Sequence, residues 1–181
     1  FTRRSITCGG AGHYGVRRVI AYSGLHVAGY KLKEASHMPT DKLITVFIVA
    51  VLLNYLWELA QARLYVGLEA YNAGVFWHCF VASLGDGIMV LLIVATGWIT
   101  LRQPDWFVRP SIPGYLVMIT SGLFLAVLVE WVAVHGLGRW VYAEKIPTVP
   151  GLGIGLVPIA QMLILPPLIF RIATVIQARK K

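Results

Sequence analysis

The chain has 181 residues, of which 57% are hydrophobic and only 13% are charged. Water-soluble domains usually carry about 25% charged residues, so this composition excludes an ordinary soluble domain and indicates an integral membrane protein. The formal net charge is +8, but +5 of it falls in residues 1–37 and only +3 in residues 38–181. A basic tail alone is weak evidence for nucleic-acid binding, and we expect no nucleic-acid partner.

Residues 1–37 form a basic segment that we leave out of the predicted fold. The segment is rich in Gly, Arg and Ser without a helical apolar pattern, and it lacks the apolar run of a secretory signal. The first methionine is Met38, and Ser36-His37-Met38 resembles a cloning scar. In-frame upstream sequence, a cloning leader and a native basic arm on the cytoplasmic surface are the three alternatives. We expect residues 1–37 to be non-native or disordered and residues 38–181 to form the membrane domain.

Four apolar segments follow, and each is long enough for a membrane-spanning helix, which needs about 20 residues. They cover approximately residues 43–64, 75–100, 112–135 and 152–176. The linkers between them are short, and prolines punctuate the second and the third, so neighbouring helices should be antiparallel. The predicted fold is all-α: a polytopic membrane protein with about four transmembrane helices in an antiparallel bundle.

The fourth segment is unusual in its glycines and prolines. Three glycines lead into Pro158, and Pro166 and Pro167 follow. Backbone groups that proline frees inside a membrane must find other partners. We therefore expect a kinked helix or a re-entrant turn, which could be a bent packing helix or a break that lines a substrate site.

Lys and Arg predict the orientation, because the more basic side of a membrane protein usually faces the cytoplasm. One side would receive Lys42, Arg102, Arg109, Arg171, Arg179, Lys180 and Lys181, and the other Arg63, Arg139 and Lys145. Both termini should therefore be cytoplasmic.

Polar side chains interrupt all four apolar segments. The candidate functional cluster consists of Asn54, Glu58, Gln61, His78, Asp86, Glu130, Arg139 and Gln161. The first three are four and three residues apart, so they share one helical face. A rise of about 1.5 Å per residue places the cluster between the midplane and the non-cytoplasmic side.

The acids carry the functional argument, because a charge at the bilayer centre costs about 2.5–3.5 kcal/mol and marks a functional site by default. Glu58 and Glu130 are the strongest candidates, either protonated or paired with Arg139 or His78. The structural alternative is an interhelical hydrogen-bond network, for which Asn54 and similar amides are well suited.

The sequence predicts no metal, cofactor or disulfide. Cys8 and Cys79 lack the spacing of a disulfide or zinc framework. Two glutamates and two histidines, Glu58, Glu130, His78 and His135, could supply ligands, but they come from different segments without diagnostic spacing. The sequence also lacks phosphate-loop, zinc-protease and serine-hydrolase motifs.

Several motifs together resemble a family of small, uncharacterised bacterial membrane proteins. They are Asn54-x-x-Trp57-Glu58-x-x-Gln61, His78-Cys79 followed by Gly85-Asp86, Glu130 followed by Gly138-Arg139-Trp140-x-Tyr142, and Pro147-x-x-Pro150-Gly151-x-Gly153-x-Gly155-Leu156-x-Pro158-x-x-Gln161. The resemblance covers the chain from about Met38 onward. It implies a four-helix protein of the bacterial inner membrane and no particular activity.

A fainter similarity links the chain to carotenoid-pathway membrane hydratases. Those enzymes also have a membrane acid, a turn rich in glycine and aromatic residues, and a proline-bearing helix. Glu130, Gly138, Tyr142 and Pro147 would correspond. The chain is much shorter than these enzymes and lacks most of their spans.

Three functions follow from these observations. The protein could be an enzyme acting on a lipid or isoprenoid, with Glu130 or Glu58 as the proton donor. It could be a proton or cation transport element, which would need an oligomer because four helices rarely enclose a pore. It could also be a non-catalytic partner whose polar cluster stabilises the bundle. The expected partners are the lipid bilayer, a second copy or another membrane protein.

Overall fold

A computed structural model of the chain describes residues 40–179. The basic segment 1–37, Cys8 and the last two lysines lie outside the described residues. The elements are α2 (Thr40–Gln61), the 3-10 turn η1 (Ala62–Leu64), α3 (Ala73–Leu101), α4 (Ile112–Trp131), the π-helical turn η2 (Val132–Gly136) and α5 (Leu156–Ala178). Four helices are long and apolar enough to cross a membrane. The prediction of an all-α fold with four spans is confirmed.

Local sequence signals set the helix boundaries close to the predicted positions. Asn72 caps α3, because its Oδ1 accepts the backbone N–H of Val75 at 3.0 Å. Arg102 ends α3 in the left-handed region, with a φ of 54°. A proline, Pro113, occupies the first turn of α4, where its missing N–H costs no helical hydrogen bond.

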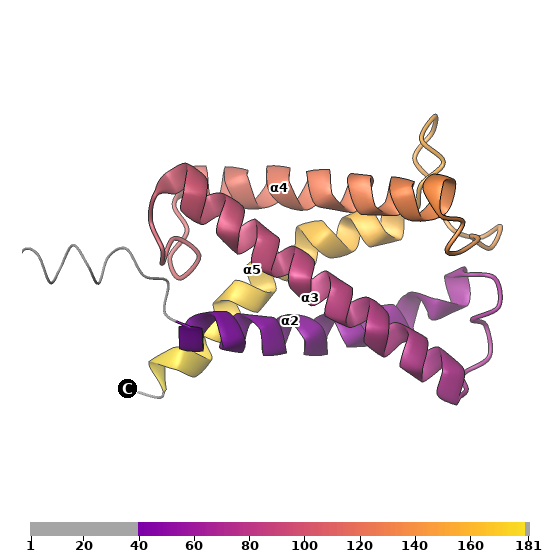
Figure 1. Cartoon of the computed structure of the whole chain (residues 1–181), viewed down its shortest axis with the longest axis horizontal. Coiled ribbons are helices and arrows are strands. Elements are labelled where there is room, and N and C mark those ends of the chain that lie inside the picture. The colour runs from indigo at the N-terminus through magenta and orange to yellow at the C-terminus, as the bar shows by residue number, and fades with distance from the viewer. Residues whose placement is uncertain (1–39, 180–181) are drawn as a thin grey trace, which may run out of the picture. The chain divides into compact units, whose positions relative to one another are not determined.

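The fourth span is one continuous helix. Pro158 lies in the first turn of α5, and Pro166 and Pro167 lie inside the helix. The helix is continuous from Leu156 to Ala178, and Figure 1 shows it crossing behind α3. The re-entrant alternative was therefore wrong. The glycines before α5 instead make a separate turn, in which Gly151 and Gly153 have φ values of 81° and 63°.

The helices pack as a ring in which each one contacts its neighbours. α2 packs against α3 and α5, and α4 packs against the same two helices. In Figure 1, α2 and α4 run along opposite sides while α3 crosses in front, and successive helices run in opposite directions. We call the end that holds the α2–α3 and α4–α5 linkers the distal end. The proximal end holds the α3–α4 linker.

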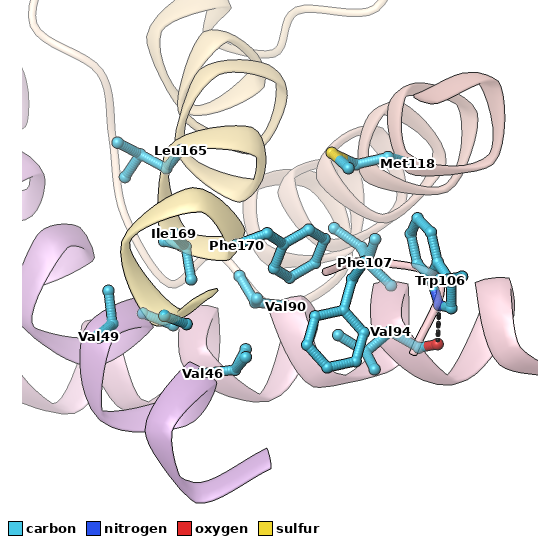
Figure 2. Packing of buried hydrophobic residues seen from close by; sticks show 13 residues of the cluster. Val46, Val49, Val90, Val94, Trp106, Phe107, Met118, Leu165, Ile169 and Phe170 are labelled. Atoms are coloured by element: carbon cyan, nitrogen blue, oxygen red, sulfur yellow. Dashed lines mark hydrogen bonds between the residues drawn. The ribbon is translucent and has the colours of Figure 1, made fainter. Parts of the chain in front are cut away.

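One apolar core lies in the proximal half (Figure 2). Figure 2 labels ten of its members: Val46, Val49, Val90, Val94, Trp106, Phe107, Met118, Leu165, Ile169 and Phe170. Trp106 Nε1 donates to the carbonyl of Val94 at 2.9 Å, so the indole is anchored against α3. Gly97 makes room for this ring, because a Cβ there would lie 2.1 Å from it. This half contains packed hydrocarbon where the distal half contains polar groups.

The two linkers at the distal end are joined by backbone hydrogen bonds. The N–H of Val66 donates to Val141 and that of Ala143 donates to Leu64, both at 2.9 Å. Three aromatic rings pack beside this bridge: Tyr65 lies 5.7 Å from Tyr142 and 6.2 Å from Trp140, between ring centroids. We call residues 64–66 and 140–143 the roof, because they cover the distal end of the helices.

Candidate functional site

The predicted polar face of α2 points into the bundle. Asn54 and Gln61 are buried, and Glu58 is partly buried between them along the helix. Gln61 Nε2 donates to Glu58 Oε1 at 2.7 Å. Trp57 Nε1 in turn donates to Gln61 Oε1 at 3.1 Å, which fixes the orientation of the amide. The spacing of Trp57, Glu58 and Gln61 along α2 therefore holds the Glu58 carboxyl group in one orientation.

Gln161 on α5 connects three helices through one side-chain nitrogen. Its Nε2 donates to Asn54 Oδ1 on α2 at 2.9 Å and to Asp86 Oδ2 on α3 at 2.8 Å. A third and longer contact, 3.2 Å, reaches Glu58 Oε1. An amide nitrogen has only two hydrogens, so the two shorter contacts are the full bonds and the third is shared. Glu58 and Asp86 thus lie on either side of one donor atom.

Glu130, near the end of α4, is held by a different partner. It is 5% exposed, and the hydroxyl of Tyr142 in the roof donates to its Oε1. The backbone N–H of Gly155 donates to the same hydroxyl oxygen at 2.8 Å. Burial, and then the neighbouring Glu130, raise the pKa of Tyr142 above its ordinary value, so the hydroxyl keeps its proton and acts as a donor. The α4–α5 linker therefore positions the carboxyl group of α4.

A cavity of about 400 Å³ lies under the roof. This volume falls in the range of about 300–1,000 Å³ that is usual for small-molecule sites. Seven residues of the predicted cluster line it: Glu58, Gln61, His78, Asp86, Glu130, Arg139 and Gln161. The eighth, Asn54, is fully buried and is bonded to Gln161. The structure thus brings together, around one space, side chains from all four spans.

The two basic candidates lie at the edge of this cavity. His78 and Arg139 are both exposed. Among residues 40–179 the ion pair is Lys42 with Asp105 at the proximal end, and neither His78 nor Arg139 forms one with Glu58 or Glu130. Of the two alternatives for these acids, the one in which Glu58 or Glu130 pairs with Arg139 or His78 is therefore wrong. The acids are held instead by amides and a phenol.

The side chains that could bind a metal ion do not gather into a metal site in the described part of the chain. No group of three or more His, Cys, Asp and Glu side chains there could hold a metal ion. The ring of His135 lies elsewhere, with its Nε2 at 2.9 Å from the carbonyl oxygen of Leu152.

Several lining residues were not in the predicted cluster. Tyr65 and Trp140 come from the roof, and Met89 and Met162 from α3 and α5. Tyr142 was also missed; it is not among the lining residues but binds Glu130, which is. The motif Gly138-Arg139-Trp140-x-Tyr142 was the available signal, but spacing along the chain cannot show that a linker folds back over the bundle.

Comparisons with known proteins identify no relative of this chain. No family model matches the chain, and neither a curated protein nor a solved structure gives a significant match. The fold and the chemistry of the cavity are therefore the basis for a functional proposal.

Proposed function

We propose that this protein is a membrane-embedded enzyme that transfers a proton to or from a lipid or isoprenoid. The observation that carries the proposal is that Glu58, Asp86 and Glu130 all line one ligand-sized cavity. Carboxyl groups among membrane-spanning helices are costly to maintain. In a purely structural network, these carboxyl groups would be fully hydrogen-bonded within a closed core. Here they border a cavity instead.

Glu130 is the proposed proton donor. Tyr142 binds its Oε1, and the carboxyl group lines the cavity. A substrate in the cavity can therefore reach this group, and a neutral carboxyl group in apolar surroundings can protonate such a substrate. Tyr142 is a positioning residue in this scheme, because it orients the acid without needing to reach the substrate.

Glu58 and Asp86 form the proposed second acid–base group. They share Gln161 Nε2 as a donor. Two carboxylates so close together repel each other strongly in a medium of low dielectric constant, which favours a pair that holds a proton. Such a pair can accept the proton that the reaction releases, or return one to Glu130.

The apolar core disfavours the alternative of a transport element. The polar network reaches from the roof to the level of Asn54, Asp86 and Gln161, and an apolar core occupies the proximal half among the described residues. A proton or cation relay needs a polar route across the whole membrane. The cavity fits a ligand that enters and leaves from one side.

The resemblance noted above supports the location and the substrate class of this proposal. We infer a bacterial inner-membrane location with both termini in the cytoplasm, from the bias of Lys and Arg. The fainter similarity to carotenoid-pathway hydratases, through Glu130 and Tyr142, favours an isoprenoid among the lipid substrates.

Glutamine substitution tests the proposal directly. Lipid extracts of cells that express the wild type should differ from empty-vector cells by a substrate–product pair in mass spectrometry. Glu130→Gln should lower the product at least about 100-fold, the lower end of what a general acid contributes. Glu144→Gln is the matched control, because Glu144 is exposed and is not among the cavity-lining residues.

Tyr142→Phe separates positioning from proton donation. It removes the hydroxyl group but keeps the ring, so we expect reduced turnover with the carboxyl group still present. If Glu130→Gln, Glu58→Gln and Asp86→Asn each remain folded and all form product at the wild-type rate, the enzyme proposal is wrong.

A further inference from the structure

The exposed lining residues of the cavity gather on one flank of the described bundle. They are His78, Val81, Gly85, Val129 and Arg139. All but Arg139 belong to α3 and α4. Lining residues from α2 and α5 are buried or partly buried. The mouth therefore lies between α3 and α4, two membrane-spanning helices, and the roof covers the distal end.

On the side of the mouth away from His78 and Arg139, the edge is apolar and continues along α3. Val81, Gly85, Ile88 and Leu92 are separated by four, three and four residues, so they share one helical face. The three side chains among them are 46%, 54% and 47% exposed. An apolar chain could lie along this face, because hydrocarbon surrounds it in a bilayer.

Hydrogen-bond donors without a protein acceptor lie at the distal edge of the same cavity. Trp140 Nε1 is buried and has no hydrogen-bond partner among the described residues. Arg139 is exposed and makes no ion pair with any described carboxylate. A buried donor left unpaired is costly, so a ligand that supplies an acceptor would be stabilised here. An anionic oxygen satisfies both the indole N–H and the guanidinium.

We infer that a lipid with an anionic head group enters this cavity sideways from the bilayer, between α3 and α4. Its head binds Arg139 and Trp140, its first carbons reach the carboxyl groups, and its chain leaves over the α3 face from Val81 to Leu92. A cavity of about 400 Å³ holds a head group and a few carbons but not a whole lipid. The inference deepens the proposed function by naming the substrate class and its route, and it rests on that proposal for its chemistry.

Photocrosslinking tests this route in the full chain reconstituted in neutral phosphatidylcholine vesicles. The probes are diazirine analogues of palmitate, of farnesyl phosphate and of the uncharged farnesol. Mass spectrometry should find the anionic probes on residues 81–92 and 125–132. Labelling by one anionic probe alone also supports the inference, because it tells a carboxylate head from a phosphate head. If neither anionic probe labels these segments, or farnesol labels them equally well, the inference is wrong.

Two variants with matched controls sharpen the test. A Cβ at Gly85 would meet no atom within 4 Å, so Gly85→Trp should fill the mouth without disturbing the fold. We expect it to lower labelling at least about tenfold, whereas Gly85→Ala should label normally. Arg139→Gln should lower labelling by the anionic probes about tenfold through loss of a charge-assisted bond. Arg109→Gln, at an exposed site on the proximal α3–α4 linker, should have no effect. Unchanged labelling of Gly85→Trp would rule out lateral entry.

Glu130→Gln distinguishes failure of the route from failure of the proposed function. We expect this variant to label as the wild type does, because its cavity is retained, while it forms no product. Labelling without any product in the wild type would contradict the enzyme proposal alone. A product that depends on Glu130, without labelling between α3 and α4, would contradict the lateral route alone.

Discussion

Gln161 is the residue on which the polar network depends. Its side-chain nitrogen joins α5 to Asn54 and Asp86, and its oxygen accepts from Gln61 at 3.3 Å. Removing it leaves several buried polar groups without a partner. Each such group costs about 1–3 kcal/mol. The residue therefore contributes to stability as well as to the geometry of the acids.

Replacing Gln161 by Met tests this dependence. The side chains have similar volumes, so we expect destabilisation of about 2–4 kcal/mol from lost hydrogen bonds rather than from a cavity. Gln177→Met is the matched control in the same helix, because Gln177 Nε2 is buried without a hydrogen-bond partner. Thermal unfolding in detergent, followed by circular dichroism, should show a clear loss of stability for Gln161→Met only. Equal melting curves for both variants would contradict this role.

The sequence predicts those features of the site residues that depend on local spacing, and not those that depend on how the helices pack. The common face of Asn54, Glu58 and Gln61 follows from helical spacing alone, as does the antiparallel threading that gathers the acids. The hydrogen-bond partners do not follow, because they depend on the rotation of each helix about its axis. The sequence therefore left protonation, or pairing with Arg139 or His78, as alternatives for the acids, whereas the structure has Gln161 and Tyr142 as their partners.

At the scale of elements, one glycine sets the approach of α4 to α5. A Cβ at Gly122 would lie 2.7 Å from the backbone oxygen of Met162. Small residues allow such close backbone contact between membrane helices. This contact brings α4, which carries Glu130, against the helix that carries Gln161.

The substitution Gly122→Ala should therefore push the two helices apart. We expect a loss of about 1–3 kcal/mol, the usual cost of overpacking. Gly85→Ala provides the comparison, since it adds the same methyl group in a helix where space is open. It should be neutral or slightly stabilising, because alanine favours a helix over glycine by about 1 kcal/mol. Similar unfolding temperatures for the two variants would show that the close approach is unimportant.

The extents of the helices were predictable because length and hydropathy alone define a membrane span. The structure of the α4–α5 linker was not, because it depends on backbone pairing with the α2–α3 linker, 75 or more residues away in sequence. The prolines of α5 suggested a re-entrant turn that the structure does not have, and the reason again lies in packing. Proline removes one hydrogen bond, but packing of α5 against α2 and α4 keeps the helix continuous.

For the whole molecule, the division into an apolar proximal half and a polar distal half predicts that the protein does not conduct. Purified protein in liposomes should give no proton flux above that of empty liposomes, measured with an enclosed pH-sensitive dye. The reason is that, within residues 40–179, the apolar core of Val46, Val90 and Phe170 interrupts the polar network. Flux that disappears in Asp86→Asn would contradict this prediction and restore the transport alternative.

Orientation across the membrane can be measured with single cysteines. In a Cys8→Ser, Cys79→Ser background, Glu144→Cys lies at the distal end and Gln103→Cys at the proximal end, both at exposed positions. If the termini are cytoplasmic, a membrane-impermeant maleimide should label position 144 on intact spheroplasts, and position 103 only after permeabilisation. The reverse pattern would place the cavity on the cytoplasmic side.

The apolar core also determines which lipids the cavity can sample. Because the lining residues of the cavity lie in the distal half and the apolar core lies in the proximal half, the entry that we infer between α3 and α4 would lie in one leaflet of the bilayer. A substrate synthesised in the opposite leaflet would have to be flipped before it could react. In asymmetric vesicles we therefore expect turnover to follow the composition of the leaflet at the roof and to ignore that of the other.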